Sequence, residues 1–288
     1  MSLKTILGNF MHEDSMRLEH KTKLFFRVFK TWKYEKQMQT LFESLKIEDI
    51  LAKHPRFYNK FSRPHLKSNL NNAQKMRFMT EHYHYMVENF EKQALHHFYH
   101  DSALLYDFEE SGIDLQLNIT YMRFLEREGE IMLNLTQHDG TRIYSMAGTF
   151  YEGDFYISGI QGYKDIELIR KYTKACFGMR PHNLLFYALL TFLKNLGVAR
   201  VFAISNEEQI YNEKKTKKKV LFDYEDFFED IYAKTLTQED GWFLLDLDYP
   251  LKPIEEVKSK KRSMYKKRYA LLESMDISIY SSLEAYKR

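Results

Sequence analysis

The 288-residue sequence contains one cysteine, Cys176, and few glycines or prolines. A single thiol excludes an intrachain disulfide, which suits a reducing compartment. The 11 glycines and 5 prolines favour short connections between elements. The formal net charge is only +3, too small to indicate a partner by itself. The sequence therefore predicts a fold held by its core rather than by cross-links.

Long apolar runs are also missing. The longest candidate, residues 184–193, is far shorter than the ~20 apolar residues that a membrane span needs. Residues 1–10 lack the basic stretch followed by an apolar run that marks a signal peptide. We therefore expect a soluble cytoplasmic protein with no transmembrane segment, and the oligomeric state is left open.

Apolar residues recur at helical spacing in the first third of the chain, to about residue 105. Beyond it, apolar and polar residues alternate with the two-residue period of half-buried strands. Turn signals at Glu128-Gly129, Asp139-Gly140 and Gly153-Asp154 divide this part. They predict four antiparallel strands, which cover about 114–125, 130–138, 141–151 and 154–161.

The helical period then returns. A helix from about 165 should stop at Gly178, and Pro181 can open the next one because the first helical position needs no amide donor. That second helix, about 182–196, is apolar on most sides, which predicts burial on more than one side. Further elements are predicted at the end of the chain: a strand at 198–204, a helix at 224–233, a strand at 242–247 and a last helix from Pro253.

These elements predict an α+β fold. A helical N-terminal region (1–110) precedes an α+β domain (111–288) with a mostly antiparallel sheet. A meander whose last strand leads to a glycine-containing loop, a helix and a further strand resembles the core of Gcn5-related acyltransferases. The sequence departs from that pattern in two ways: it lacks the usual glycine-rich run, and an extra helix precedes the loop.

Several segments between residues 155 and 272 resemble the bacterial VirK/YbjX family, a domain of unknown function (DUF535). They are Ile160-Gln161-Gly162, Arg170–Lys174, Gly178-Met-Arg-Pro-His182, Gly197–Ser205, Tyr224-Glu-Asp-Phe-Phe, Gly241-Trp-Phe and Lys260-Lys-Arg262 with Tyr265 and Arg268. Phe228 stands where the family pattern leads us to expect Trp, and Gln209 where a polar residue, often His, is expected. The resemblance implies a bacterial protein linked to virulence, envelope stress and resistance to antimicrobial peptides. It implies no known reaction.

The acyltransferase-like order suggests a binding site at the start of the 182–196 helix. Free amides and the helix dipole favour anions there, such as the pyrophosphate of an acyl coenzyme A. The candidate cofactor-binding residues are Gly178, Met179, Arg180, His182 and Lys174. The donor would be an acyl thioester of coenzyme A or of an acyl carrier protein. The alternative is an ordinary helix cap, with Arg180 paired to a carboxylate.

Two residues at strand ends are candidates for catalysis. Gln161 could orient a substrate carbonyl, and Ser205 could supply a hydroxyl, although no Gly-x-Ser-x-Gly motif surrounds it. The structural alternatives are a turn after a strand for Gln161 and a helix cap for Ser205. We prefer the cap for Ser205.

A non-enzymatic alternative rests on basic runs. One run covers 214–219. The other contains the candidate anion-binding residues Lys260, Lys261, Arg262 and Arg268 beside Tyr265 and Tyr269, a composition that suits nucleic acid or anionic lipid. An exposed cationic helix is the simpler interpretation.

Histidines gather between residues 82 and 100. His96 and His100 are four apart, so both could face one metal on a helix. No His-Glu-x-x-His motif is present and the single cysteine offers no help, so we expect no metal site and favour surface histidines.

Overall fold

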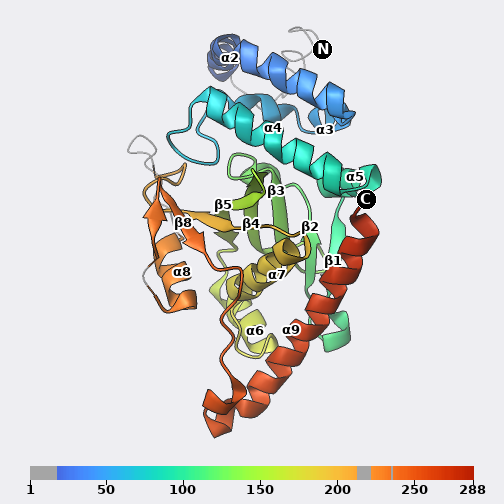
Figure 1. Cartoon of the computed structure of the whole chain (residues 1–288), viewed down its shortest axis with the longest axis vertical. Coiled ribbons are helices and arrows are strands. Elements are labelled where there is room, and N and C mark those ends of the chain that lie inside the picture. Colours follow the sequence, from blue (N-terminus) through green and yellow to red (C-terminus); the bar gives the residue numbers. More distant parts are fainter. Residues whose placement is uncertain (1–17, 213–221, 235) are drawn as a thin grey trace.

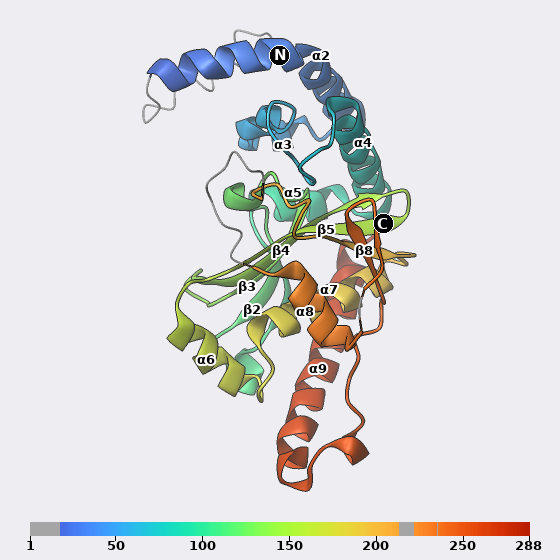
Figure 2. The same cartoon turned by 90° about the vertical axis from the view of Figure 1, so that its left-hand side faces the viewer.

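The computed structural model describes residues 18–212, 222–234 and 236–288. Helices α2 to α5 form a layer across one end of a central sheet, and α7 and α9 pack beside the sheet (Figures 1 and 2). The α+β class is thus confirmed. No helix among the described residues is long and apolar enough to cross a membrane.

The described residues contain helices and short 3-10 turns. Their bounds are α2 Leu18–Leu45, α3 Glu48–Lys53, α4 Asn72–Asn89, α5 Lys92–His100, α6 Ile166–Ala175, α7 Pro181–Asn195, α8 Tyr224–Tyr232 and α9 Ser259–Tyr286. The 3-10 turns are η1 Pro55–Lys60, η2 Glu109–Ser111, η3 Arg123–Leu125 and η4 Ile254–Glu256. The last helix therefore begins at Ser259 and not at Pro253, because a separate 3-10 turn occupies the acidic segment.

The eight described strands form one mixed sheet in the order β1-β2-β3-β4-β5-β6-β8-β7. Only β5 and β6 pair in parallel, and the other neighbours are antiparallel. The bounds are β1 Ala103–Asp107, β2 Gln116–Ile119, β3 Ile131–Thr136, β4 Arg142–Tyr151, β5 Asp154–Gly162, β6 Val201–Ile204, β7 Gln238–Glu239 and β8 Trp242–Leu245.

The four expected meander strands are β2 to β5. The turn between β4 and β5 places Glu152 and Gly153 at φ values of 51° and 80°, the left-handed region that a tight hairpin requires. The first of these strands is shorter than expected, because the 3-10 turn η3 follows it. Strand β1 was not expected; it lies where the helical period was thought to continue to about 105.

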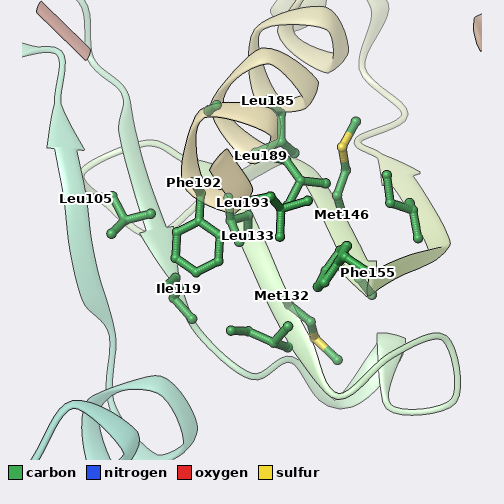
Figure 3. Packing of buried hydrophobic residues seen from close by; sticks show 14 of the residues in the cluster. Leu105, Ile119, Met132, Leu133, Met146, Phe155, Leu185, Leu189, Phe192 and Leu193 are labelled. Carbon is green, nitrogen blue, oxygen red and sulfur yellow. The ribbon is translucent and has the colours of Figure 1, made fainter. Parts of the chain in front are cut away.

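Helix α7 supplies much of the core. Leu185, Leu189, Phe192 and Leu193 point toward sheet residues such as Leu133 (Figure 3). Nine of its residues are buried, which confirms the expectation from its apolar surface. Pro181 occupies the first turn, as expected. The helix is therefore fixed firmly against the sheet, and its N-terminal end is held in place.

A buried ionic cluster joins the helical layer to the sheet. The fully buried carboxylate of Glu130 accepts hydrogen bonds from Lys60 Nζ (2.5 Å), His65 Nε2 (2.7 Å) and Tyr83 OH (2.8 Å). Burial alone would raise its pKa, but the Lys60 ammonium and the His65 hydrogen bond hold the pKa of Glu130 well below its ordinary value. Burial lowers the pKa of His65 to about 4, so this ring is neutral at neutral pH. Both oxygens of Glu130 therefore have partners.

Residues at the end of α9 are tied back to the sheet and to the helical layer. Ser278 Oγ donates to the Leu105 carbonyl of the edge strand β1 at 2.8 Å. Lys287 forms a β-bridge with Phe90, and the Arg288 amide donates to the Asn89 carbonyl at 3.1 Å. This clamp connects α4 and α5 to a segment about 200 residues further along the chain.

Candidate functional site

The parallel strands β5 and β6 separate halfway along β5. They pair from Phe155–Ile157 with Val201–Ala203. Ser158 is then an extra residue, because Ala147 of β4 pairs with Gly159 while Gly148 pairs with Ile157. Such a bulge bends its strand and ends regular pairing. Residues 158–162 consequently have no strand partner on the β6 side among the described residues.

Tyr224 of α8 closes the gap that this separation leaves. Its side chain is 1% exposed, and its hydroxyl accepts a hydrogen bond from the Ile160 amide at 3.0 Å. Burial raises the pKa of this phenol well above its ordinary value, so the hydroxyl stays neutral. A side chain thus replaces the missing strand carbonyl. Any ligand that entered between the two strands would have to displace this ring.

A buried acid lies beside the same stretch of β5. Glu128 Oε1 accepts a hydrogen bond from Gln161 Nε2 at 2.6 Å, whereas Oε2 is buried with no hydrogen-bond partner. Burial raises the pKa of Glu128 to about 8. Gly159 allows this approach, since a Cβ there would overlap the carboxyl group. The result is a carboxyl that exchanges its proton near neutral pH, a property typical of acid–base groups.

The surroundings of Gln161 are polar. Arg142 Nη1 donates to the Gln161 carbonyl at 3.0 Å, and its guanidinium lies 4.2 Å from the centre of the Phe124 ring. Gln161 pairs across the strands with Ser145, whose hydroxyl donates to Asn134 Oδ1 at 2.5 Å. Polar side chains therefore form a row along one face of the sheet.

The start of α7 lies at the other face. Gly162 pairs with Tyr144, whose ring centre is 5.2 Å from that of His182. Adjacent residues of a strand point to opposite faces, so His182 lies behind the face that carries Gln161. No side chain caps the α7 amides, and Arg180 occupies the N-cap position. The first amides of the helix therefore keep the affinity for anions that helix N-termini have.

Two hollows flank Arg180. The first, of about 250 Å³, is rich in cations and hydroxyl groups; its lining is Gly178, Met179, Arg180, Asn183, Asp230, Tyr249, Pro250, Leu251, Lys252, Tyr265, Arg268 and Tyr269. The second, of about 600 Å³, is acidic and aromatic; its lining is Arg180, His182, Phe222, Asp223, Asp226, Phe227, Glu229 and Asp230. Charge makes the first hollow the better place for a phosphate, since carboxylates of α8 would repel it from the second.

Arg268 fixes one wall of the first hollow. Its Nε and Nη2 donate to the Phe177 carbonyl at 3.1 and 2.7 Å, and its guanidinium lies 4.2 Å from the Tyr265 ring centre. Gly178 has a φ of 79°, which a side chain would strain. Residues from the α6–α7 loop and from α9 thus converge on one hollow.

Comparison with known proteins places the chain in a family. A model for a protein family of unknown function, DUF535, matches residues 13–281. The chain belongs to the DUF535 family. The uncharacterized protein YbjX of Escherichia coli K12 is 26% identical over 282 residues, which cover 93% of this chain and 83% of that protein. An uncharacterized protein of Haemophilus influenzae is 29% identical over 170 residues, 58% of this chain and 57% of that protein. No solved structure matches.

The fold of this DUF535 protein brings some of the candidate residues together. One hollow is lined by Gly178, Met179, Arg180 and Arg268. The sequence had suggested Arg268 for the non-enzymatic anion-binding surface and not for this site. His182 lines the neighbouring hollow. Burial lowers its pKa to about 4, so the ring is neutral and unsuited to pairing with phosphate by charge.

Other candidates lie elsewhere. Lys174 is exposed at the end of α6 and lines neither hollow. Lys260 and Lys261 are exposed on the first turn of α9. Arg262 donates to the Val257 and Glu255 carbonyls, both at 3.0 Å, and so holds the turn before α9. The run 214–219 lies outside the described residues.

Ser205 occupies a structural position. It is fully buried; its amide donates to the Gly241 carbonyl at 3.0 Å and its hydroxyl accepts from the Glu208 amide at 3.4 Å. These contacts hold the turn after β6. The described residues that directly follow Ser205 form turns and not a helix, so this contact is not the helix cap that the sequence favoured.

Sequence reasoning in this DUF535 chain missed Glu128, Arg142 and Tyr224. Glu128 appeared only as part of a turn signal. One pattern could have exposed it: Gly159 sits inside the predicted strand 154–161, where glycine often marks close approach by another group. Nothing in the sequence links Tyr224 to Ile160.

Proposed function

We propose that this protein is an acyltransferase that binds the phosphopantetheine thioester of coenzyme A or of an acyl carrier protein. The carrying observation is the separation of β5 from β6 beside the uncapped start of α7. The strand order β5-β6-β8-β7, with one parallel pair, supports the proposal by analogy with Gcn5-related acyltransferases. The phosphate groups would occupy the hollow of Arg180, Lys252 and Arg268.

The thioester arm would pass from this hollow through the gap that Tyr224 fills. The acyl carbon would then lie near Gln161, on the sheet face where Glu128 is buried. Gln161 Nε2 is the donor available to orient the acyl carbonyl, and it would have to leave Glu128 Oε1 to do so. Positioning of this kind supplies a large part of enzymatic rate enhancements.

The reaction would exchange one bond for another. A nucleophilic acceptor forms a bond to the acyl carbon, the carbon–sulfur bond breaks, and the thiol leaves. Glu128, ionised before the step, takes the proton that the acceptor loses and passes it to the departing sulfur. A pKa of about 8 suits both halves of this transfer near neutral pH.

Thermal unfolding with coenzyme A, acyl coenzyme A and acyl-pantetheine tests the binding half. We expect the two coenzyme A compounds to raise the Tm, and the phosphate-free thioester to do so much less. Arg180→Ala should abolish the shift. Arg170→Ala is the matched control, because Arg170 is exposed on α6 and pairs only with Glu167 among the described contacts. No shift with any thioester, or an unchanged shift in Arg180→Ala, would exclude the proposal.

A separate observation supports a second candidate function. Five lysines near the start of α9 are exposed, and this end of the helix projects beyond the sheet (Figure 2): Lys258, Lys260, Lys261, Lys266 and Lys267. Such a surface suits a non-enzymatic role that engages an anionic partner, lipid or nucleic acid. Co-sedimentation with phosphatidylglycerol vesicles, lost in salt and in Lys260→Ala/Lys261→Ala, would support it. Equal binding to neutral vesicles would exclude anionic lipid as the partner.

The link to virulence, envelope stress and antimicrobial-peptide resistance stays a prediction from the family resemblance. It is compatible with either function, since lipids and peptides can both accept acyl groups, and anionic lipids are suitable partners for a basic surface. Only the binding experiments above separate the two.

A further inference from the structure

Two groups of metal-ligating side chains occur in the described part of the chain. One contains His96, His97 and Asp101, and the other Asp107, Glu109 and His138; in each, one ligand atom per residue lies within 4.8 Å of the others. Neither group touches the hollows beside α7. The distances between the side-chain atoms inside each group show that the two groups are different kinds of site.

Hydrogen bonds to His138 hold the second group together. His138 Nδ1 is 2.7 Å from Asp114 Oδ1, and Nε2 is 3.0 Å from Asp107 Oδ1, both ordinary hydrogen-bond lengths. These bonds to carboxylates raise the pKa of His138. An imidazole that donates from both nitrogens offers no lone pair to a metal. This group is an ion-pair network.

The first group is spaced differently. Asp101 Oδ2 lies 3.4 Å from His96 Nδ1 and 3.6 Å from His97 Nδ1, and no hydrogen bond joins either pair. A tetrahedral ion with bonds of ~2.0–2.1 Å separates its ligands by ~3.3–3.4 Å. Both distances to Asp101 are therefore close to the ligand separation around one ion, and both are too long for good hydrogen bonds. All three ligand atoms lie within 4.8 Å of one another.

The helix end explains the spacing. His97 and Asp101 are one turn apart at the end of α5, where Asp101 is the C-cap residue. His96 is kept in place by His100, whose ring stacks on it at 4.3 Å with an angle of 6° between the planes. His100 Nε2 in turn lies 3.0 Å from Asp49 Oδ2, a close contact without hydrogen-bond alignment. The stacked ring limits the rotation of His96.

The ligand atoms face an open hollow of about 530 Å³ at the junction of α3 and α5. Its lining is Ile47, Asp49, Ile50, Lys92, Gln93, Leu95, His96, His97 and Asp101. The side chains of His96, His97 and Asp101 are 51%, 37% and 58% exposed, so an ion has free access. Three protein ligands leave a fourth position for water or a small anion on the side of the hollow.

We propose that His96, His97 and Asp101 bind a divalent transition-metal ion, with zinc the best fit to two imidazoles and one carboxylate. His100 acts as a positioning residue through His96. The sequence singled out the pair His96 and His100, with Asp101 adjoining, and argued against a site because no His-Glu-x-x-His motif is present and the single cysteine offers no help. The structure replaces that pair: His100 stacks on His96, and His97 and Asp101 supply the other ligands.

Competition with a chromophoric chelator and the visible absorption of bound cobalt test the site. The full chain should bind one equivalent of zinc at micromolar concentration, and cobalt should give the intense bands of a four-coordinate ion. His96→Ala/His97→Ala should abolish both signals. His84→Ala is the matched control, because His84 is an exposed histidine of the neighbouring helix α4. Circular dichroism verifies that each variant is folded.

One further measurement separates a built site from adventitious binding. His100→Ala should lower the affinity about tenfold while the cobalt bands persist, as expected for loss of a group that orients a ligand. Absence of a stoichiometric equivalent in the full chain, or its persistence in His96→Ala/His97→Ala, would overturn the proposal.

Discussion

Glu128 and Glu130 lie on either side of Gly129, and both are fully buried, yet their environments have opposite effects. Glu130 has a cation, an imidazole and a phenol around it, and its pKa is held below the ordinary value. Glu128 has one amide donor and an oxygen without a partner, and its pKa rises to about 8. Burial alone therefore does not decide ionisation; the number and charge of the hydrogen-bond partners do.

The difference gives stability two opposite dependences on pH. Glu130 has a depressed pKa and His65 titrates at about 4 instead of 6.5, so their contributions are lost as pH falls. Glu128 titrates at about 8 instead of 4.5, so the folded state holds its proton more tightly and stability is lost as pH rises through that interval. One acid anchors the fold, and the other is the group available for proton transfer.

The largest effect is expected from Glu130→Ala. This change leaves the buried Lys60 ammonium without its partner, which should lower the free energy of unfolding by roughly 3–5 kcal/mol. Guanidinium unfolding at neutral pH measures it. Lys60→Met/Glu130→Met removes both charges and should recover part of the loss. If the single and double variants have the same free energy of unfolding, the unpaired charge of Lys60 is not the cause of the loss.

Glu128→Gln should have a smaller effect with the opposite sign. A neutral amide cannot ionise, so the decline in stability between about pH 5 and about pH 8 should flatten. Above that range the variant should exceed the parent by roughly 1–3 kcal/mol, the cost of an unsatisfied buried polar group. Urea unfolding at several pH values measures the slope. An identical slope in both proteins would show that Glu128 is ionised at all pH values used.

Tyr224→Phe tests a neutral buried acceptor for comparison with these charged groups. It leaves the Ile160 amide without an acceptor and should lower the free energy of unfolding by roughly 1–2 kcal/mol. Tyr280→Phe, at an exposed residue of α9, is the control and should change little. If both variants behave alike in chemical denaturation, the Tyr224 hydroxyl does not hold the open edge of β5.

The smallest effect is expected from Gln161→Ala. Its hydrogen bond lowers the pKa of Glu128, so removal should raise that pKa further. Near pH 6 the carboxyl is protonated in either protein, and stability should change by less than about 0.5 kcal/mol. Carbon-13 shifts of the labelled glutamate carboxyls report the titration directly. A fall in the Glu128 pKa would contradict this account of the pair.

Local patterns predicted much of the fold. The Asp139-Gly140 and Gly153 turns defined the meander, and Pro181 marked the start of α7, because these residues control the backbone next to them. β1 was missed because its five residues, Ala103–Asp107, follow a helix without a glycine or proline between them. Short strands take their conformation from neighbours in the sheet, and these are invisible in a single sequence.

The candidate site could be predicted only where it depends on local sequence. Residues 178–182 were identified because a glycine and a proline flank a helix start. The environment of Glu128 depends on Gln161, 33 positions away, and the edge of β5 depends on Tyr224, 64 positions from Ile160. Contacts at such separations are set by the sheet order, which periodicity does not determine.

The bridge between Phe90 and Lys287 has a consequence for biosynthesis. Helices α4 and α5 leave the ribosome early, but their junction stays without this pairing until almost all of the described chain has been translated. During that interval the apolar side of the helical layer can meet only early partners or chaperones. A bulky protein fused directly after Arg288 should hinder formation of the bridge between Phe90 and Lys287. A reporter attached there should therefore slow maturation more than one joined through a long linker.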